Sequence, residues 1–174
     1  MLAFASPALA QQTPVWSDID CAQSHLKVPD GIKCRATQEY AGGTGATSSA
    51  GGVFRRWAAF GKIGNAKLYY WMGEGLGGQS NFQETRSFDA VVRNTSPQGN
   101  DARHFSELKH VPGADYMLFT SAQGEHCFGL HAFGPSVSVG YKWILMATRC
   151  QHRDREYSAD EIARFLAETG YLGS

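Results

Sequence analysis

Several residues that could do chemistry lie close together in the second half of the chain: Glu125, His126 and His131, with His104 and His110 as further imidazoles. Imidazole and carboxylate groups bind zinc or copper and also act as general acids or bases. His126 and His131 are five positions apart on an expected strand, so their side chains point to opposite faces. Both cannot bind one metal ion unless the strand bulges. We therefore expect no metal site and keep His126 as a candidate acid or base.

The glycine-rich segment Gly73–Gly78 is expected to form a flexible connection. Glu74 is a second candidate acid, because it is the one carboxylate in this segment. Glycan-cleaving enzymes generally use two carboxylates, and no partner for Glu74 is evident from the sequence. The chain also lacks a Gly-x-Ser-x-Gly elbow, a His-Glu-x-x-His zinc motif and a Cys-x-x-Cys-His haem motif. These observations favour a protein without catalytic activity or cofactor. A hydrolase of envelope polymers, with Glu74 or His126 as acid or base, is the alternative.

A group of aromatic and basic residues offers a surface for a ligand. Arg56, Phe60, Tyr69 and Trp71 belong to this group. Aromatic faces stack on the C–H groups of sugars, and arginine binds carboxylates through two hydrogen bonds. Core packing would explain the same residues without a ligand, and a large exposed patch would separate the two interpretations. We predict a ligand site at these four residues, beside the glycine-rich loop 41–52.

A β-hairpin is expected to position this group. The segments 53–62 and 67–73 flank Gly64-Asn65, which suits a type II′ turn because glycine readily adopts a positive φ. Both faces of the hairpin are apolar, which is typical of a central strand pair. The turn pairs Phe60 with Tyr69 and Ala58 with Trp71 on one face, and Trp57 with Met72 and Ala59 with Tyr70 on the other.

Four cysteines predict two disulfides in an exported chain. The segments 126–133 and 141–150 indicate a second hairpin, and a loop centred midway between them sets one cysteine of each strand directly opposite the other. The two remaining cysteines would close a short loop near the N-terminus. Without a Cys-x-x-Cys spacing, structural bridges are favoured over redox chemistry. The predicted bridges are Cys127–Cys150 and Cys21–Cys34.

The C-terminal helix has the clearest start signal in the chain. Ser158 and Glu161 form a capping box, in which each side chain binds a backbone amide of the other residue. Gly170 is placed to end this helix in a left-handed conformation. Its apolar face consists of Ile162, Phe165 and Leu166.

The remaining segments predict short elements. A helix is expected over Val15–Ala22 and strands over Ile32–Tyr40 and Asp115–Ser121. Phe88, Val91 and Val92 suit a helix, although 86–93 also fits a strand. The segment 102–110 fits a short helix, and 104–111 fits a strand. A turn is expected at 96–100 in either case.

The first ten residues resemble the back half of an export signal. Small side chains at Ala8 and Ala10 suit a signal-peptidase site, and the chain becomes polar at Gln11. We therefore expect residues 1–10 to be removed and residues 11–174 to form one globular domain that is periplasmic or secreted. No later apolar stretch reaches the roughly 20 residues that would span a bilayer, so no transmembrane segment is expected in the mature chain.

The charge balance argues against nucleic acid as a partner, because 16 basic residues match 16 acidic ones. The sequence thus predicts an α+β domain: one antiparallel sheet of about five to seven strands, a C-terminal helix on one face and two disulfides. The expected function is binding of a small ligand or an envelope protein. The alternatives are the hydrolase and a purely structural envelope protein.

Overall fold

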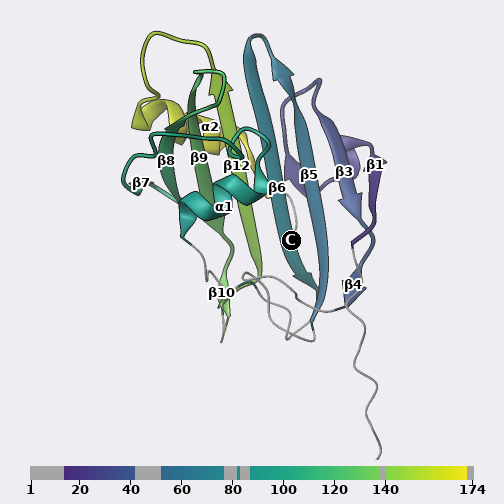
Figure 1. The fold of residues 1–174 in the computed structure, drawn as a ribbon. Coiled ribbons are helices and arrows are strands. Elements are labelled where there is room, and N and C mark those ends of the chain that lie inside the picture. Colours follow the sequence, from purple (N-terminus) through teal and green to yellow (C-terminus); the bar gives the residue numbers. More distant parts are fainter. Residues whose placement is uncertain (1–13, 42–51, 77–81, 83–86, 138–139, 172–174) are drawn as a thin grey trace, which may run out of the picture.

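A large antiparallel sheet dominates the computed structural model, which describes residues 14–41, 52–76, 82, 87–137 and 140–171 (Figure 1). The strand order of the main sheet is β1-β3-β5-β6-β12-β9-β8-β7, and β4 also pairs with β5. Its strands are β1 (Trp16–Ile19), β3 (Lys33–Thr37), β4 (Tyr40–Ala41), β5 (Val53–Ile63), β6 (Ala66–Leu76), β7 (Lys109–Val111), β8 (Ala114–Thr120), β9 (His126–Phe133) and β12 (Trp143–Gln151).

Two helices and two small strand pairs complete the described fold. The helices are α1 (Phe88–Thr95) and α2 (Ala159–Glu168), and a 3-10 turn, η1, covers Cys21–Gln23. The small pairs are β2 (Leu26–Lys27) with β13 (Gly170–Tyr171) and β10 (Ser136–Val137) with β11 (Gly140–Tyr141). The class is α+β, as predicted. The main sheet has nine strands rather than five to seven, because short edge strands add to the expected hairpins.

The two predicted hairpins have the expected registers. In the first, Phe60 faces Tyr69 and Ala58 faces Trp71, with Gly64 at φ +57° in the turn. In the second, Cys127 faces Cys150. Both predicted disulfides are present, Cys127–Cys150 and Cys21–Cys34, with Cα–Cα distances of 4.2 and 5.2 Å.

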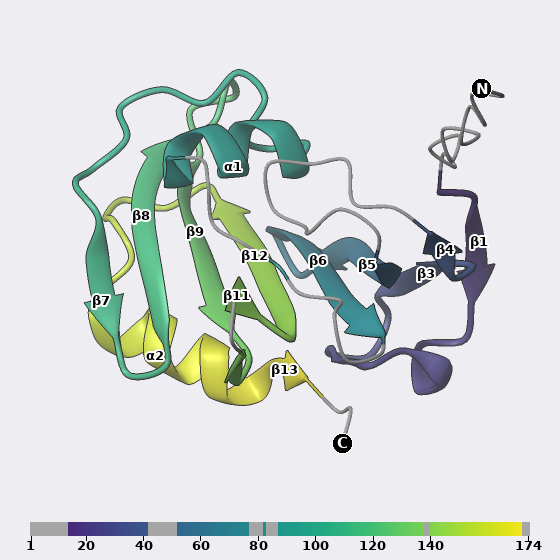
Figure 2. The same ribbon diagram turned by 90° about the horizontal axis from the view of Figure 1, so that it is seen from below.

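Helices α1 and α2 pack on opposite faces of the β8-β9-β12 part of the sheet (Figure 2). We call these faces the α1 face and the α2 face. On the α2 face, Ile162 and Phe165 of α2 join Phe128 and Leu130 in the largest core cluster. This cluster also contains Trp57, so it continues beneath the N-terminal segment. On the α1 face, buried residues of α1 pack around the Cys127–Cys150 bridge: Phe88, Val91 and Val92.

Three local expectations are corrected by the structure. The segment 15–22 is strand β1 followed by η1 instead of a helix, because Trp16–Ile19 pairs with β3 along its length. Gly73 to Leu76 extend β6 rather than forming a flexible connection, whereas 77–78 and most of 41–52 lie outside the described residues.

The third correction concerns Gly170, and the structure also decides between the alternatives for two open segments. Helix α2 ends at Glu168, and its C-cap Thr169 has a φ of −111°. Gly170 of β13 pairs with Lys27 of β2 instead of adopting a left-handed conformation. The segment 88–93 is helical, and 102–110 is mostly extended, with β7 at its end.

The capping box at the start of α2 predicts a loss of stability in acid. The Ser158 amide donates to Glu161 at 2.8 Å, and the Arg153 guanidinium lies at 2.8 Å. These contacts lower the pKa of Glu161 from 4.5 to about 2. A carboxylate with a lowered pKa stabilises the fold above its unfolded-state pKa and loses that contribution as pH falls through the folded-state value.

We therefore expect Glu161→Gln to lower the free energy of unfolding by about 1 kcal/mol at pH 6 and to flatten its decline between pH 4.5 and 2. Urea unfolding across this pH range measures both effects. Glu156→Gln, an exposed change in the same connection, is the matched control. Parallel pH profiles for wild type and Glu161→Gln would show that the capping box does not titrate as described.

Candidate functional site

The four predicted ligand residues lie on the α1 face of the central hairpin. Arg56 and Phe60 come from β5, and Tyr69 and Trp71 come from β6. They share one face because alternate residues of a strand point the same way. Helix α1 lies over β9 and β12, and within the described part of the chain neither helix covers β3 and β5 (Figure 1). This part of the face is where the sequence places the ligand site.

These four residues divide into two pairs along the hairpin. Trp71 is half-buried, with Phe82 edge-on at 6.5 Å between ring centroids and the Arg56 guanidinium 5.6 Å from its ring centroid. Phe60 is 37% exposed and Tyr69 is half-buried. Burial raises the pKa of the Tyr69 phenol, and the charge of Arg35 partly opposes that shift. Arg56 and Trp71 therefore act partly as packing residues, whereas Phe60 and Tyr69 face an opening.

That opening is a groove of about 420 Å³ at the tip of the hairpin. One side of the groove is formed by Phe60 and Tyr69 of the hairpin, and the other by the turn that follows α1. The hydrocarbon stems of the lysines can extend the apolar wall, since long cationic side chains cover apolar surface while their charges remain in water. We call this the hairpin groove. Its side chains include Phe60, Lys62, Lys67, Tyr69, Pro97 and Gln98.

Beside the groove, Lys67 forms a largely buried ion pair. Its ammonium group lies 2.9 Å from each carboxylate oxygen of Glu125. The Glu125 side chain is 2% exposed, whereas that of Lys67 is 31% exposed. Ser121 donates its hydroxyl to Glu125 at 3.0 Å and accepts the Glu125 amide at 3.2 Å. The pair therefore fixes the lysine at the groove and leaves its charge neutralised.

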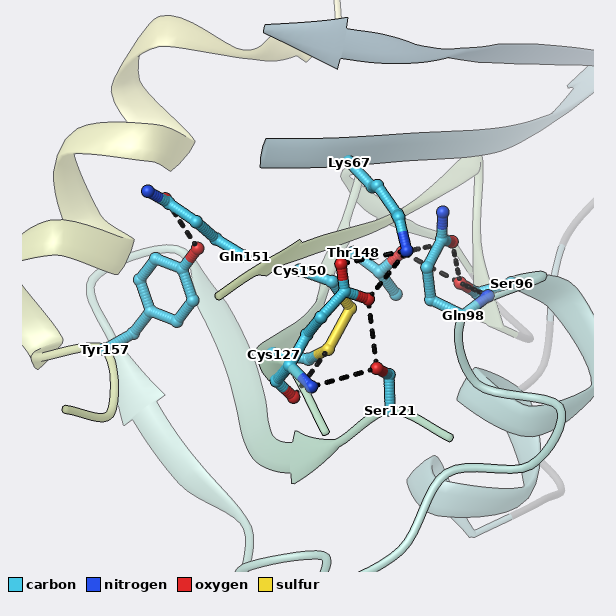
Figure 3. The surroundings of a disulfide bond; sticks show 10 residues. Lys67, Ser96, Gln98, Ser121, Cys127, Thr148, Cys150, Gln151 and Tyr157 are labelled. Carbon is cyan, nitrogen blue, oxygen red and sulfur yellow. Dashed lines mark hydrogen bonds and ion pairs between the residues drawn. A yellow bond between two sulfur atoms is a disulfide. The ribbon is translucent and has the colours of Figure 1, made fainter. Parts of the chain in front are cut away.

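A second polar cluster holds the opposite wall in place. The hydroxyls of Ser96 and Thr148 lie 2.8 Å apart, and both contact the Gln98 side-chain oxygen, at 2.8 and 3.3 Å. Figure 3 shows these residues and Lys67 close to the Cys127–Cys150 bridge. Thr148 lies two positions before Cys150 in β12, so the same strand supports both the disulfide and the groove wall.

The candidate acid Glu74 lies on the other face, away from the groove. Its carboxylate is 3.0 Å from Nδ1 of His25, and its side chain is 14% exposed. The His25 ring stacks on Trp57 at 4.5 Å. Glu74 therefore has an imidazole partner, which the sequence did not reveal because His25 lies 49 positions away.

Glu74 and His126 are located at opposite ends of the sheet. Glu74 faces Trp143, and His126 faces Gln151, eight residues further along β12. At about 3.3 Å per residue, this places them on the order of 26 Å apart. The two candidate acids therefore cannot act on one substrate bond. Among the described residues, Glu74 has an acid–base partner, His25, and His126 has none.

His131 is a buried histidine on the α1 face, opposite in orientation to His126, as the strand periodicity predicts. It lies 3.3 Å from Asp115 and packs against Phe88 and Phe133. Burial lowers the pKa of His131, although the hydrogen bond to Asp115 partly opposes this. His110 also pairs with Asp115. Over the described residues, no group of three or more His, Cys, Asp or Glu side chains is arranged to hold a metal ion.

Sequence reasoning missed the polar half of the groove. It identified the aromatic pair and the turn at 96–100, but not that this turn closes over the hairpin. A local signal existed for the lysines, because Lys62 and Lys67 flank the Gly64-Asn65 turn as a cross-strand pair.

Comparison with protein-family models gives no match, and neither a curated protein nor a solved structure matches the chain. None of the helices in the described ranges is long and apolar enough to cross a membrane.

The buried pair beside the groove predicts a strong energetic coupling. Lys67→Met leaves the Glu125 carboxylate buried with Ser121 alone, so it should destabilise the protein by about 2–4 kcal/mol. The double variant Lys67→Met/Glu125→Gln should recover part of this loss, because no uncompensated buried charge remains. Urea unfolding followed by tryptophan fluorescence measures the four species of this cycle. If the losses in free energy of unfolding of the two single variants sum to that of the double variant, the pair contributes no coupling energy.

Proposed function

We propose that this protein is an exported ligand-binding protein and that its ligand occupies the hairpin groove. The single observation that supports this most is the exposed position of Phe60 at the edge of an apolar groove of about 420 Å³. This volume lies within the range of small-molecule sites, which are mostly apolar with a few polar groups that fix orientation. The ligand therefore presents an apolar or aromatic body to Phe60, Tyr69 and Pro97.

The charges at the groove favour a ligand with one acidic group. Lys62 and Lys67 face each other across the hairpin, and like charges in this arrangement repel. Glu125 neutralises Lys67, whereas Lys62 is exposed at the rim. A carboxylate next to Lys62 would complete the charge balance. Small apolar carboxylates are thus the class that the groove fits best.

The proposed location is the periplasm or the extracellular medium. Two disulfides support it, since such bonds persist mainly in oxidising compartments. The partly apolar N-terminal segment ending at Ala10 supports it from the sequence.

A naphthalene carboxylate is a suitable first probe for the groove. Titration calorimetry should detect binding to the wild-type protein, and Tyr69→Ser or Phe60→Ser should weaken it by about tenfold or more, because each removes an aromatic contact. Lys62→Glu should also weaken binding by replacing attraction with repulsion.

The matched controls are Val15→Ser and Lys109→Glu, which change an exposed apolar residue and an exposed lysine outside the groove. Both should bind like the wild type. Equal binding by the groove variants and the controls would remove the groove as the ligand site. Unchanged melting temperatures for Phe60→Ser and Lys62→Glu would show that reduced binding is not caused by unfolding.

A hydrolase acting on envelope glycans is a second candidate, and the contact between His25 and Glu74 favours it. An imidazole at 3.0 Å can exchange a proton with the carboxylate and hold it in place. Release of reducing ends from purified envelope glycans tests this activity. Glu74→Gln should abolish turnover, and the exposed change Glu39→Gln should leave it unaltered. Undiminished turnover in Glu74→Gln would exclude Glu74 as the acid.

A further inference from the structure

A second hollow, of about 450 Å³, lies on the α2 face between the end of β12 and helix α2. Its position is independent of the hairpin groove, which opens on the opposite face of the sheet. Three arginines and two aromatic residues contribute to its wall, and we call it the arginine pocket. Its side chains include Arg149, Arg153, Tyr157, Arg164, Phe165 and Glu168.

Arg149 is the cation that the main sheet contributes to this pocket. It lies in β12 between Leu68 and Phe128 of the neighbouring strands, and both of these belong to the core on the α2 face. Its guanidinium lies 5.9 Å from the centroid of the Tyr157 ring. Its Nε atom is buried and has no hydrogen-bond partner. The strand therefore directs a guanidinium with spare donor capacity toward the space beneath α2.

Among the described residues, no carboxylate of the pocket forms an ion pair with Arg149. Glu161 is already bound by Arg153 at 2.8 Å and Arg155 at 3.1 Å, and by the Ser158 amide. Within the part of the chain that the structure describes, no ion pair shorter than 4 Å joins Glu168 to Arg149 or Arg164. Two guanidinium groups thus remain without a bound carboxylate.

Two aromatic residues supply a smaller part of the wall. Arg153 lies over the Tyr157 ring at 4.2 Å, which holds that ring in place. The Tyr157 hydroxyl contacts Gln151 at 3.4 Å, and Figure 3 shows these two side chains reaching toward each other. Phe165 stacks on Tyr70, whose hydroxyl is buried without a hydrogen-bond partner. Tyr157 is 6% exposed and Phe165 4% exposed, so the pocket combines cationic donors with the edges of two largely covered rings.

We propose that the arginine pocket binds an organic phosphate monoester. Guanidinium groups bind phosphate oxygens through paired hydrogen bonds. A phosphate monoester is close to a dianion at neutral pH, so it matches two arginines that lack a bound carboxylate. A pocket of about 450 Å³ has the size of a small-molecule site rather than that of a single ion. The phosphate lies between Arg149 and Arg164, and the organic part lies against the ring edges of Tyr157 and Phe165 that line the pocket.

Phenyl phosphate is the probe for this pocket, titrated into the full chain at low salt by calorimetry and by phosphorus NMR. We expect Arg164→Gln and Arg149→Gln to weaken binding by about tenfold or more, because each removes charge-assisted hydrogen bonds. Glu168→Gln should strengthen binding several-fold, because it removes a carboxylate from the wall. Arg103→Gln, an exposed change outside the pocket, should bind like the wild type.

Arg164 is exposed, so its variant tests the proposal even if Arg149→Gln does not fold. Absence of phenyl phosphate binding, or equal binding by Arg164→Gln and Arg103→Gln, would overturn the proposal. If inorganic phosphate bound as strongly as phenyl phosphate, the ring contacts would contribute nothing, and the proposal of an organic ligand would be wrong. Phe60→Ser should leave phenyl phosphate binding unchanged, which separates this pocket from the hairpin groove.

Discussion

The register of β12 is the constraint on which the rest of the structure depends. This strand pairs over eight residues with β6 on one side and over eight with β9 on the other. A slip of one residue would turn every side chain to the opposite face. Thr148 would leave the polar cluster that supports the wall of the hairpin groove, and Arg149 would leave the arginine pocket. Cys150 would no longer face Cys127, so the disulfide and the register stabilise each other.

Adjacent residues of this strand serve the two candidate sites. Thr148 points to the α1 face, where it bonds to Ser96, and Arg149 points to the α2 face beneath helix α2. Both faces are covered along β12, so polar groups there have to be paired or aimed at a cavity. Thr148 meets the first requirement through hydrogen bonds. Arg149 meets the second, which is why the arginine rather than the threonine indicates a ligand.

The sequence predicted those features that depend on local chemistry. The Gly64-Asn65 turn predicted the pairing of Phe60 with Tyr69, because turn type fixes register over short distances. The centre of the second hairpin loop predicted that Cys127 faces Cys150. Strand β1 was missed because four residues carry too little periodicity to distinguish a strand from a helix. Gly170 was misread because its pairing with Lys27 outweighs a local preference for helix termination.

The candidate sites were predictable only in part, because a local pattern predicts contacts within one hairpin but not contacts between distant segments. An aromatic face follows from alternation within one hairpin, so Phe60 and Tyr69 could be grouped from sequence alone. The groove wall requires Ser96 and Thr148 to meet across 52 positions, and no local pattern encodes that contact. The arginine pocket likewise needs α2 to lie over β12, a packing arrangement set by Phe165 against Phe128. Tertiary packing, rather than any short motif, creates both cavities, and this explains why a chain without recognisable catalytic motifs can still carry two chemically distinct hollows.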